Sequence, residues 1–362
     1  MAEDRDSLRP QGSKMAGNGT PKRSMTMTAA ASTKATNTTA TTTHPSTSNT
    51  TTTTVHRSSP FLPTPLERLV LAAYPAILVF GAAFAALSPE TRGAPYDAAR
   101  QAHVPSQAPS YFARKDNVVN VLFVKRGWLW VTAAFAAFAG THPALRQGGG
   151  RARAARAARA AARWAAVTGW WVLVTQWCLG PPLIDRGFRV TGGKCVVALE
   201  AVAAAAAQAG RKELLTAAAC RAAGGRWSGG HDISGHVFLL VLGSCFLLQE
   251  VAWVLLRGGA RIAGAAADDD RAVVMPDGAV KGAGVESARP AAAHERHLGI
   301  GGKFALGVVG LSLWMLLMTA VYFHTWFEKL TGLLVASIGV YTVYILPRWI
   351  PAWRAVVGLP GI

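Results

Sequence analysis

The residues best suited to chemistry lie at the end of a glycine-rich stretch. This stretch runs from Cys220 to His236 and reads C-R-A-A-G-G-R-W-S-G-G-H-D-I-S-G-H. An apolar run begins directly after it, so Ser234, Gly235 and His236 stand where a helix is expected to start. The free backbone N–H groups and the positive dipole end of a helix start suit a phosphate group. The position therefore predicts an anion site with a histidine beside it.

A second histidine closes a later apolar run. His324 follows residues 304–323, and Glu328 comes four residues later, on the same face if the helix continues. One round trip through a membrane separates His236 from His324, so both are expected at the same interface. Two such histidines fit phosphoryl chemistry, in which one attacks phosphorus and the other protonates the leaving oxygen. Structural histidines at the water boundary are the alternative.

The spacing does not favour a metal centre. His231 and His236 are five residues apart, no cysteine pair has C-x-x-C spacing, and no acid–histidine helix motif is present. We therefore expect neither a metal nor a cofactor.

The elements that must position these residues are long apolar runs. Hydrophobic residues make up 51% of the 362-residue chain and charged residues only 15%, against about 25% charged in an average soluble domain. The formal net charge is +18. A nucleic-acid-binding domain would not carry several long uncharged runs, so we interpret the basic excess as charge flanking a membrane and expect no nucleic-acid partner.

Six runs are long enough to cross a bilayer, because about 20 helical residues span about 30 Å of hydrocarbon. The expected spans are residues 69–87, 127–144, 164–183, 237–256, 304–323 and 330–346. The predicted fold class is an all-α polytopic membrane protein with six transmembrane helices and a disordered N-terminal tail.

The tail is rich in threonine, with 13 between Thr33 and Thr54, and buries too little apolar surface to order. The predicted division is a disordered tail at 1–60, a six-helix domain at 61–356 with long loops at 184–235 and 257–303, and a C-terminal end at 357–362.

Basic residues near the helix ends predict the orientation. The connection between the second and third runs contains six arginines and no acid: Arg146, Arg151, Arg153, Arg156, Arg159 and Arg163. This connection, the basic tail and the C-terminus are expected in the cytosol, with loop 184–235 in the lumen. The arginine cluster is either a topology signal or a helix that touches anionic lipid.

The sequence resembles the fat storage-inducing transmembrane (FIT) family, and its fungal branch fits best. Three blocks in the expected order carry the resemblance. They are S-Y-F-A-R-K-D-N-V-V-N-V-L-F-V-K-R-G-W-L-W-V at 110–131, the stretch from Cys220 to Leu240, and T-A-V-Y-F-H-T-W-F-E-K at 319–329. The resemblance implies a multi-pass protein of the endoplasmic reticulum membrane, with both termini cytosolic and the active site lumenal.

The resemblance also implies an activity. The family is similar to lipid phosphate phosphatases and splits the pyrophosphate of fatty acyl-CoA, giving acyl 4′-phosphopantetheine and adenosine 3′,5′-bisphosphate. It is linked to lipid droplet formation, phospholipid synthesis and lipid balance in the endoplasmic reticulum. The expected partners are therefore fatty acyl-CoA and membrane lipids. A lipid phosphate phosphatase and a non-enzymatic binder of triacylglycerol or diacylglycerol remain the alternatives.

The family's S-G-H motif maps onto Ser234, Gly235 and His236, and its second active histidine maps onto His324. The carboxylate four residues later is matched by Glu328. Those phosphatases carry an arginine six residues before the second histidine, whereas this chain has Met318. Other cations must then neutralise the pyrophosphate, and the candidates are Lys125, Arg126 and Lys329.

Two further features lie away from the histidines. Glu250 is about 21 Å along the expected helix from His236, so a snorkelling or helix-pairing role is expected.

Cys195 and Cys220 are the only cysteines in loop 184–235. In an oxidising lumen we expect them to pair and hold the glycine-rich stretch, with two free thiols as the alternative.

Overall fold

The computed structural model describes residues 58–97, 102–146, 149–196, 215–262, 270–286 and 297–362. The chain divides into two units, 1–54 and 55–362, and all described residues belong to the second. Apart from 58–60, the expected tail lies outside the described residues. So do 197–214 of the expected lumenal loop and 263–269 and 287–296 of the expected cytosolic loop.

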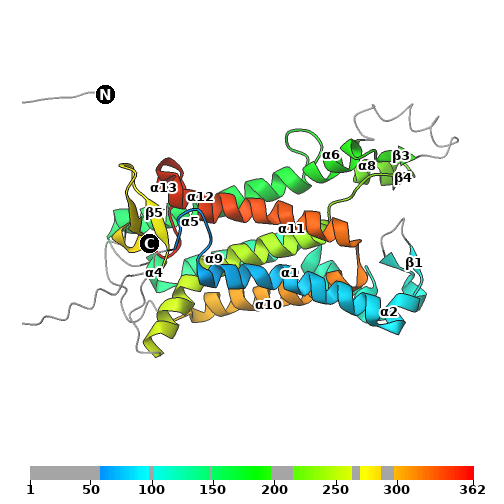
Figure 1. The fold of residues 1–362 in the computed structure, drawn as a ribbon, viewed down its shortest axis with the longest axis horizontal. Coiled ribbons are helices and arrows are strands. Elements are labelled where there is room, and N and C mark those ends of the chain that lie inside the picture. The colour runs from blue at the N-terminus through cyan, green and yellow to red at the C-terminus, as the bar shows by residue number, and fades with distance from the viewer. Residues whose placement is uncertain (1–57, 98–101, 147–148, 197–214, 263–269, 287–296) are drawn as a thin grey trace, which may run out of the picture. The chain divides into compact units, whose positions relative to one another are not determined.

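Helices dominate the described residues (Figure 1). The longer α-helices are α1 (Pro65–Leu87), α3 (Gly127–Thr141), α5 (Gly150–Thr175), α9 (Gly235–Ile262), α10 (Gly299–Tyr322) and α11 (Trp326–Val340). The shorter ones are α2 (Pro89–Gly93), α4 (Pro143–Arg146), α6 (Leu183–Val190), α8 (Ala217–Ala222), α12 (Leu346–Trp349) and α13 (Pro351–Val357). Two π-helices, η3 (Asn120–Val124) and η7 (Tyr341–Ile345), lead into α3 and α12, and short 3₁₀ turns are η1 (Pro105–Gln107), η2 (Tyr111–Ala113) and η5 (Ala283–Glu286).

Three small antiparallel ribbons interrupt the expected all-α fold. They pair β1 (Tyr96–Asp97) with β2 (Ala102–His103), β3 (Lys194–Val196) with β4 (Arg226–Ser228), and β5 (Ala272–Val274) with β6 (Val280–Gly282). All three lie in connections between the long helices, so the core remains helical.

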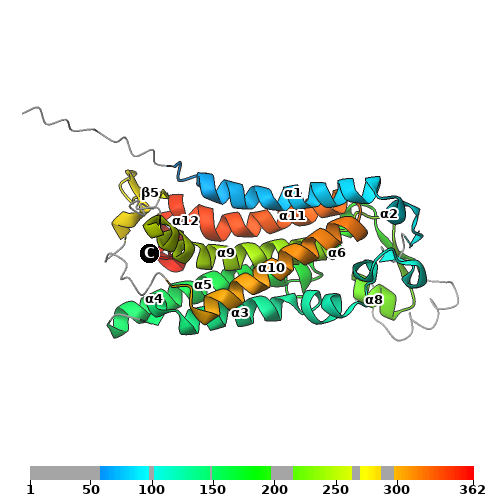
Figure 2. The ribbon, with the colours of Figure 1, turned by 90° about the horizontal axis from the view of Figure 1, so that it is seen from below.

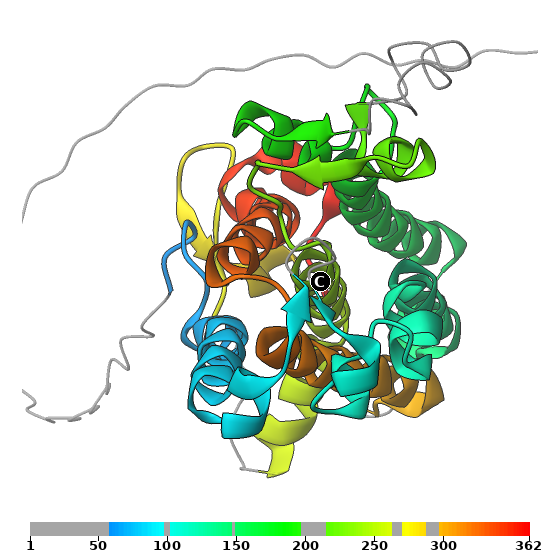
Figure 3. The same ribbon diagram turned by 90° about the vertical axis from the view of Figure 1, so that its right-hand side faces the viewer.

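Helix α9 lies at the centre of the described helices, with α3, α10 and α11 packed around it (Figure 3). The share of its apolar window that is buried is 78%, against 17% for α1. Its buried side chains, including Phe238, Leu242 and Phe246, form one core with residues of the surrounding helices. Helix α1 lies beside α10 and α11 (Figure 2).

Four of the described helices are long and apolar enough to cross a membrane: Pro65–Leu87, Gly235–Leu255, Gly299–Tyr322 and the continuous segment Trp326–Trp349. They coincide with four of the six expected runs, which confirms a helical membrane protein. The second expected run is a shorter apolar helix, Gly127–Thr141.

The expected third span, 164–183, is wrong in its second half. Helix α5 begins early, at Gly150, and ends at Thr175. Pro181 and Pro182 follow closely, and Gly180 has a φ of +101°. A proline has no N–H to donate and pushes the preceding residue out of helical geometry, so a helix cannot run through Gly180 and the two prolines to residue 183. The chain turns and restarts as α6.

At the end of the helices where α9 finishes, buried charges link several elements. Arg163 on α5 donates to both carboxylate oxygens of Glu250 on α9, at 2.6 and 2.7 Å. Tyr344 donates to the same carboxylate at 2.8 Å, and Arg163 also donates to the carbonyl of Val357. Arg163 and Glu250 are 4% and 2% exposed. Of the two roles expected for Glu250, the structure therefore shows helix pairing.

Candidate active site

His236 lies in the first turn of α9, where the sequence predicts a helix start. The hydroxyl of Ser234 accepts the N–H of Val237 at 3.3 Å, which caps the helix. The N–H of Ser234 donates to the carbonyl of Glu328 at 3.1 Å, which ties this start to α11. Ser234 is fully buried. Its hydroxyl therefore serves the helix.

Gly332 explains how closely α11 approaches the start of α9. A Cβ atom at Gly332 would lie 2.7 Å from the carbonyl oxygen of Ser234 and 3.2 Å from the Cβ of Val237. The first distance is too short for a Cβ atom, and the second is unusually tight. The glycine therefore lets the first turns of α9 and α11 meet.

Two N–H groups at this helix start face no protein acceptor. The N–H groups of Ser234, Val237 and Phe238 all donate within the protein. Within the described part of the chain, no hydrogen bond engages the N–H of Gly235 or His236. This is the pair of donors that a phosphate oxygen needs at a helix N-terminus.

His324 lies in a break between two helices. Helix α10 ends at Tyr322, and Thr325 caps α11 by accepting the N–H of Glu328, while Glu328 accepts the N–H of Thr325 at 2.8 Å. This reciprocal capping box starts α11. His324 has a φ of +61° and is the one described non-glycine residue with a positive φ. Such backbone strain concentrates at functional sites.

Two neighbours hold His324. Its Nδ1 lies 3.4 Å from Oε2 of Glu328, which is an ion-pair distance, and among the described residues this buried Nδ1 has no hydrogen-bond partner. Its backbone lies beside the hydroxyl of Tyr96, which belongs to the β1–β2 ribbon. Burial raises the pKa of the Tyr96 phenol to about 12, and the negative charge of Glu328 adds to the rise. Tyr96 therefore stays neutral beside this backbone.

The two histidines come together. Their ring centroids are 6.0 Å apart, and Phe323 stacks on His236 at 6.4 Å. The expectation that both lie at the same end of the helices is confirmed. The side chain of His324 is only 8% exposed.

Asn120 completes the site and was not among the expected residues. Its Oδ1 lies 3.2 Å from Nε2 of His236, and the residue is 3% exposed. It opens the π-helix η3, a turn type often found at functional sites. The one signal in the sequence was an amide side chain flanked by two apolar residues, Val119 and Val121, at the start of an apolar run.

The candidate cations separate into different roles. Lys329 is 5% exposed and its Nζ donates to the carbonyl of Ala320, so it joins α11 to α10. Lys125 is exposed. It and Lys115 are close enough to His236 for their positive charges to act on its ring. Arg126, the third candidate, is exposed at the N-cap of α3.

Asp232 adds a carboxylate close to the histidines. Burial raises the pKa of its carboxyl; the nearby His324 opposes this rise, and the charges of Glu328 and Asp185 reinforce it. Among the described residues, no group of three or more His, Cys, Asp or Glu side chains is arranged to hold a metal ion.

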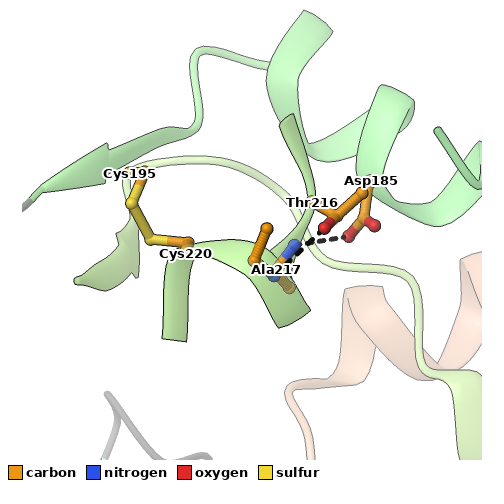
Figure 4. Close-up of a disulfide and its surroundings, with 6 residues drawn as sticks. Asp185, Cys195, Thr216, Ala217 and Cys220 are labelled. Carbon is orange, nitrogen blue, oxygen red and sulfur yellow. Dashed lines mark hydrogen bonds between the residues drawn. A yellow bond between two sulfur atoms is a disulfide. The ribbon is translucent and has the colours of Figure 1, made fainter. Parts of the chain in front are cut away.

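Cys195 and Cys220 form a disulfide, which closes a separation of 25 residues (Figure 4). It joins β3 to α8. On the other side of α8, Asp185 of α6 accepts the N–H of Ala217 at 3.3 Å. These links fix the base of the segment that leads through β4 to His236.

The sequence is similar to that of a known family of membrane proteins. The sequence model described as "Fat storage-inducing transmembrane protein" (FIT) matches residues 108–344. The chain is 31% identical over 252 residues to acyl-coenzyme A diphosphatase fit1 of Schizosaccharomyces pombe, covering 69% of this chain and 78% of that protein. It is 27% identical over 340 residues to acyl-coenzyme A diphosphatase SCS3 of Saccharomyces cerevisiae, covering 64% and 87%.

A vertebrate relative is similar too. Acyl-coenzyme A diphosphatase FITM2 of Sus scrofa is 29% identical over 239 residues, covering 65% of this chain and 72% of that protein. No solved structure matches the fold. The matched region contains Asn120, both histidines and the disulfide, and the chain belongs to the fat storage-inducing transmembrane protein family.

Proposed function

We propose that this protein is an acyl-CoA diphosphatase that cleaves the pyrophosphate of fatty acyl-CoA to acyl 4′-phosphopantetheine and adenosine 3′,5′-bisphosphate. The observation that carries the proposal is the pair of histidines with ring centroids 6.0 Å apart, beside a helix start with two unengaged N–H groups. The names of the three relatives support the substrate.

His324 is the proposed nucleophile. Its Nδ1 faces the Glu328 carboxylate, so Nδ1 carries the proton and Nε2 carries the lone pair. Nε2 attacks one phosphorus of the pyrophosphate and forms an N–P bond. The bond from that phosphorus to the bridging oxygen breaks, and its electron pair stays on the bridging oxygen.

His236 is the proposed acid and base. The protonated ring gives its proton to the bridging oxygen as the first product leaves. The neutral ring then takes a proton from a water molecule, which attacks the phosphorus and breaks the N–P bond to His324. Both histidines return to their starting protonation states.

Phosphate oxygens need neutralisation while these bonds change. The N–H groups of Gly235 and His236 sit at the positive end of α9 and suit one phosphate oxygen. Lys125 is the proposed side-chain cation. Lys329 and the Ser234 hydroxyl support the site indirectly, since both already bond within the protein.

We further propose six membrane crossings in the endoplasmic reticulum, with both termini cytosolic and the histidines lumenal. Helical turns from Val118 lengthen α3 beyond its 15 residues, and α5 packs beside α9 and α11. Successive helices begin and finish at opposite ends of the bundle. Arg348 pairs with Glu67 at the end where α1 begins, whereas Asn120 and the histidines meet at the other end. The proposed activity supports lipid droplet formation and phospholipid balance.

A direct assay tests the function. Purified protein is given fatty acyl-CoA and phosphatidic acid in parallel, and products are identified by mass spectrometry. The proposal predicts acyl 4′-phosphopantetheine and adenosine 3′,5′-bisphosphate in equal amounts. Cleavage of phosphatidic acid alone would establish a lipid phosphate phosphatase, and binding of triacylglycerol with neither cleavage would establish a lipid-binding protein.

A further inference from the structure

Asn120 occupies an unusual place at the start of η3. The N–H of Lys125 bonds to the carbonyl of Asn120 at 2.9 Å, which spans five residues instead of four. The N–H of Asn120 donates to Oδ1 of Asn117 at 2.8 Å. Backbone bonds on both sides therefore fix where the Asn120 side chain leaves the helix.

The orientation of its amide is also fixed. Nδ2 of Asn120 lies 2.7 Å from the carbonyl oxygen of Lys115. A carbonyl oxygen accepts hydrogen bonds and cannot donate one, so the amide nitrogen must face Lys115. The remaining amide atom, Oδ1, faces Nε2 of His236 at 3.2 Å.

This orientation dictates the proton positions on His236. An amide oxygen only accepts, so Nε2 of His236 must carry a hydrogen. In the neutral ring the lone pair then resides on Nδ1. The carboxylate of Glu328, 3.4 Å from Nδ1 of His324, favours a hydrogen on that nitrogen, so the proposed mechanism uses the two histidines as opposite tautomers.

We propose that Asn120 is a positioning residue, which keeps a hydrogen on Nε2 of His236 so that Nδ1 gives and takes the proton in pyrophosphate cleavage. This inference rests on the proposed function. Losing the outer partner of a metal-bound histidine typically costs about 10- to 100-fold in metal affinity or activity, and we expect a loss of similar size for the partner of this histidine.

The charges around His236 define what a substitution should do. His324 faces it from the break between α10 and α11, and Lys115 and Lys125 face it from the segment around η3. The neutral amide of Asn120 adds no charge, whereas an aspartate there would favour the protonated ring and move the alkaline limb of the pH profile to higher pH.

The test combines activity with a tautomer measurement on the full-length protein in lipid nanodiscs. Wild type, Asn120→Ala, Asn120→Asp and the matched control Leu122→Ala, an exposed side chain in the same π-helix, are assayed with fatty acyl-CoA across pH. We expect kcat to fall about 10- to 100-fold in Asn120→Ala, with KM within about twofold. We expect Asn120→Asp to keep activity with its alkaline limb displaced upward.

Nitrogen-15 NMR of labelled histidine measures the tautomer of His236 in the wild-type protein. The His236 signal, assigned by its loss in His236→Ala, should show Nε2 protonated and Nδ1 unprotonated in the neutral ring. A hydrogen on Nδ1 instead, or an Asn120→Ala protein as active as Leu122→Ala, would overturn the positioning role. If wild type fails to cleave acyl-CoA, the proposed function fails, and the tautomer measurement still judges Asn120.

Discussion

Nδ1 of His324 lies 3.4 Å from the carboxylate of Glu328, although a helix break separates the two residues. The same carboxylate accepts the N–H of Thr325 and closes the capping box of α11. One side chain therefore both starts the helix and faces the candidate nucleophile. A change at Glu328 must be designed to separate these two tasks.

Glu328→Gln makes that separation, because glutamine also completes a capping box but carries no charge. We expect α11 to remain folded and acyl-CoA cleavage to fall about 10- to 100-fold, since a neutral partner no longer stabilises the charged ring. The measurement is kcat together with thermal unfolding in detergent. Unchanged kcat in a folded Glu328→Gln protein would show that the carboxylate does not assist His324.

The disulfide should stabilise the segment that precedes His236. Closing a loop of this size contributes about 3 kcal/mol by the chain-entropy estimate. Cys195→Ser should therefore speed proteolysis between α6 and α9 and lower activity, whereas Cys178→Ser, at an exposed free cysteine, should change neither. Alkylation without reductant followed by peptide mapping checks the bond itself, and labelling of both Cys195 and Cys220 would refute it.

The buried pair of Arg163 and Glu250 should matter for folding and not for chemistry. Removing one partner of a buried ion pair costs about 3–5 kcal/mol, because the other charge is left uncompensated. Glu250→Leu should thus be strongly destabilised, and the double variant Arg163→Met/Glu250→Leu should recover much of that loss. Unfolding midpoints in detergent compare the variants. A single variant as stable as wild type would show that the pair contributes little.

The sequence predicts much of this protein because its strongest signals are physical constraints on long segments. Apolar length located four spanning helices, and counting passes brought His236 and His324 to one end. The glycine-rich run was sufficient to place the start of α9 within a few residues.

What the sequence could not predict depends on contacts between distant segments. Apolar composition continues past Thr175, but the helix ends there, and the prolines at 181 and 182 prevent a helix from running on to residue 183. Asn120 stands in the block at 110–131, in which the sequence predicts only Lys125 and Arg126 as site residues, and its role appears only when η3 meets α9. Lys329 looked available for phosphate, yet packing directs its Nζ to the carbonyl of Ala320.

The proposed orientation has its own test. The tail contains glycosylation sequons at Asn18, Asn37 and Asn49, which lie outside the described residues. A cytosolic tail meets no glycosylating enzyme, so none should be modified. A sequon engineered into the connection between α6 and α8 serves as the positive control. A glycosidase-sensitive mass shift that disappears when all three asparagines become glutamine would show the opposite orientation.

The central claim is that His324 attacks phosphorus while His236 supplies the proton. The most direct measurement is single-turnover cleavage of radiolabelled fatty acyl-CoA by wild type, His236→Ala and His324→Ala, with rapid alkaline quenching and mapping of any phosphorylated peptide. We predict a phospho-histidine at His324 in wild type and no turnover in His324→Ala. His236→Ala should be slower by about 10²–10⁴-fold, as expected for loss of general acid catalysis. A folded His324→Ala protein that cleaves acyl-CoA at a near-normal rate, or a phosphoryl group mapped to His236, would contradict the account.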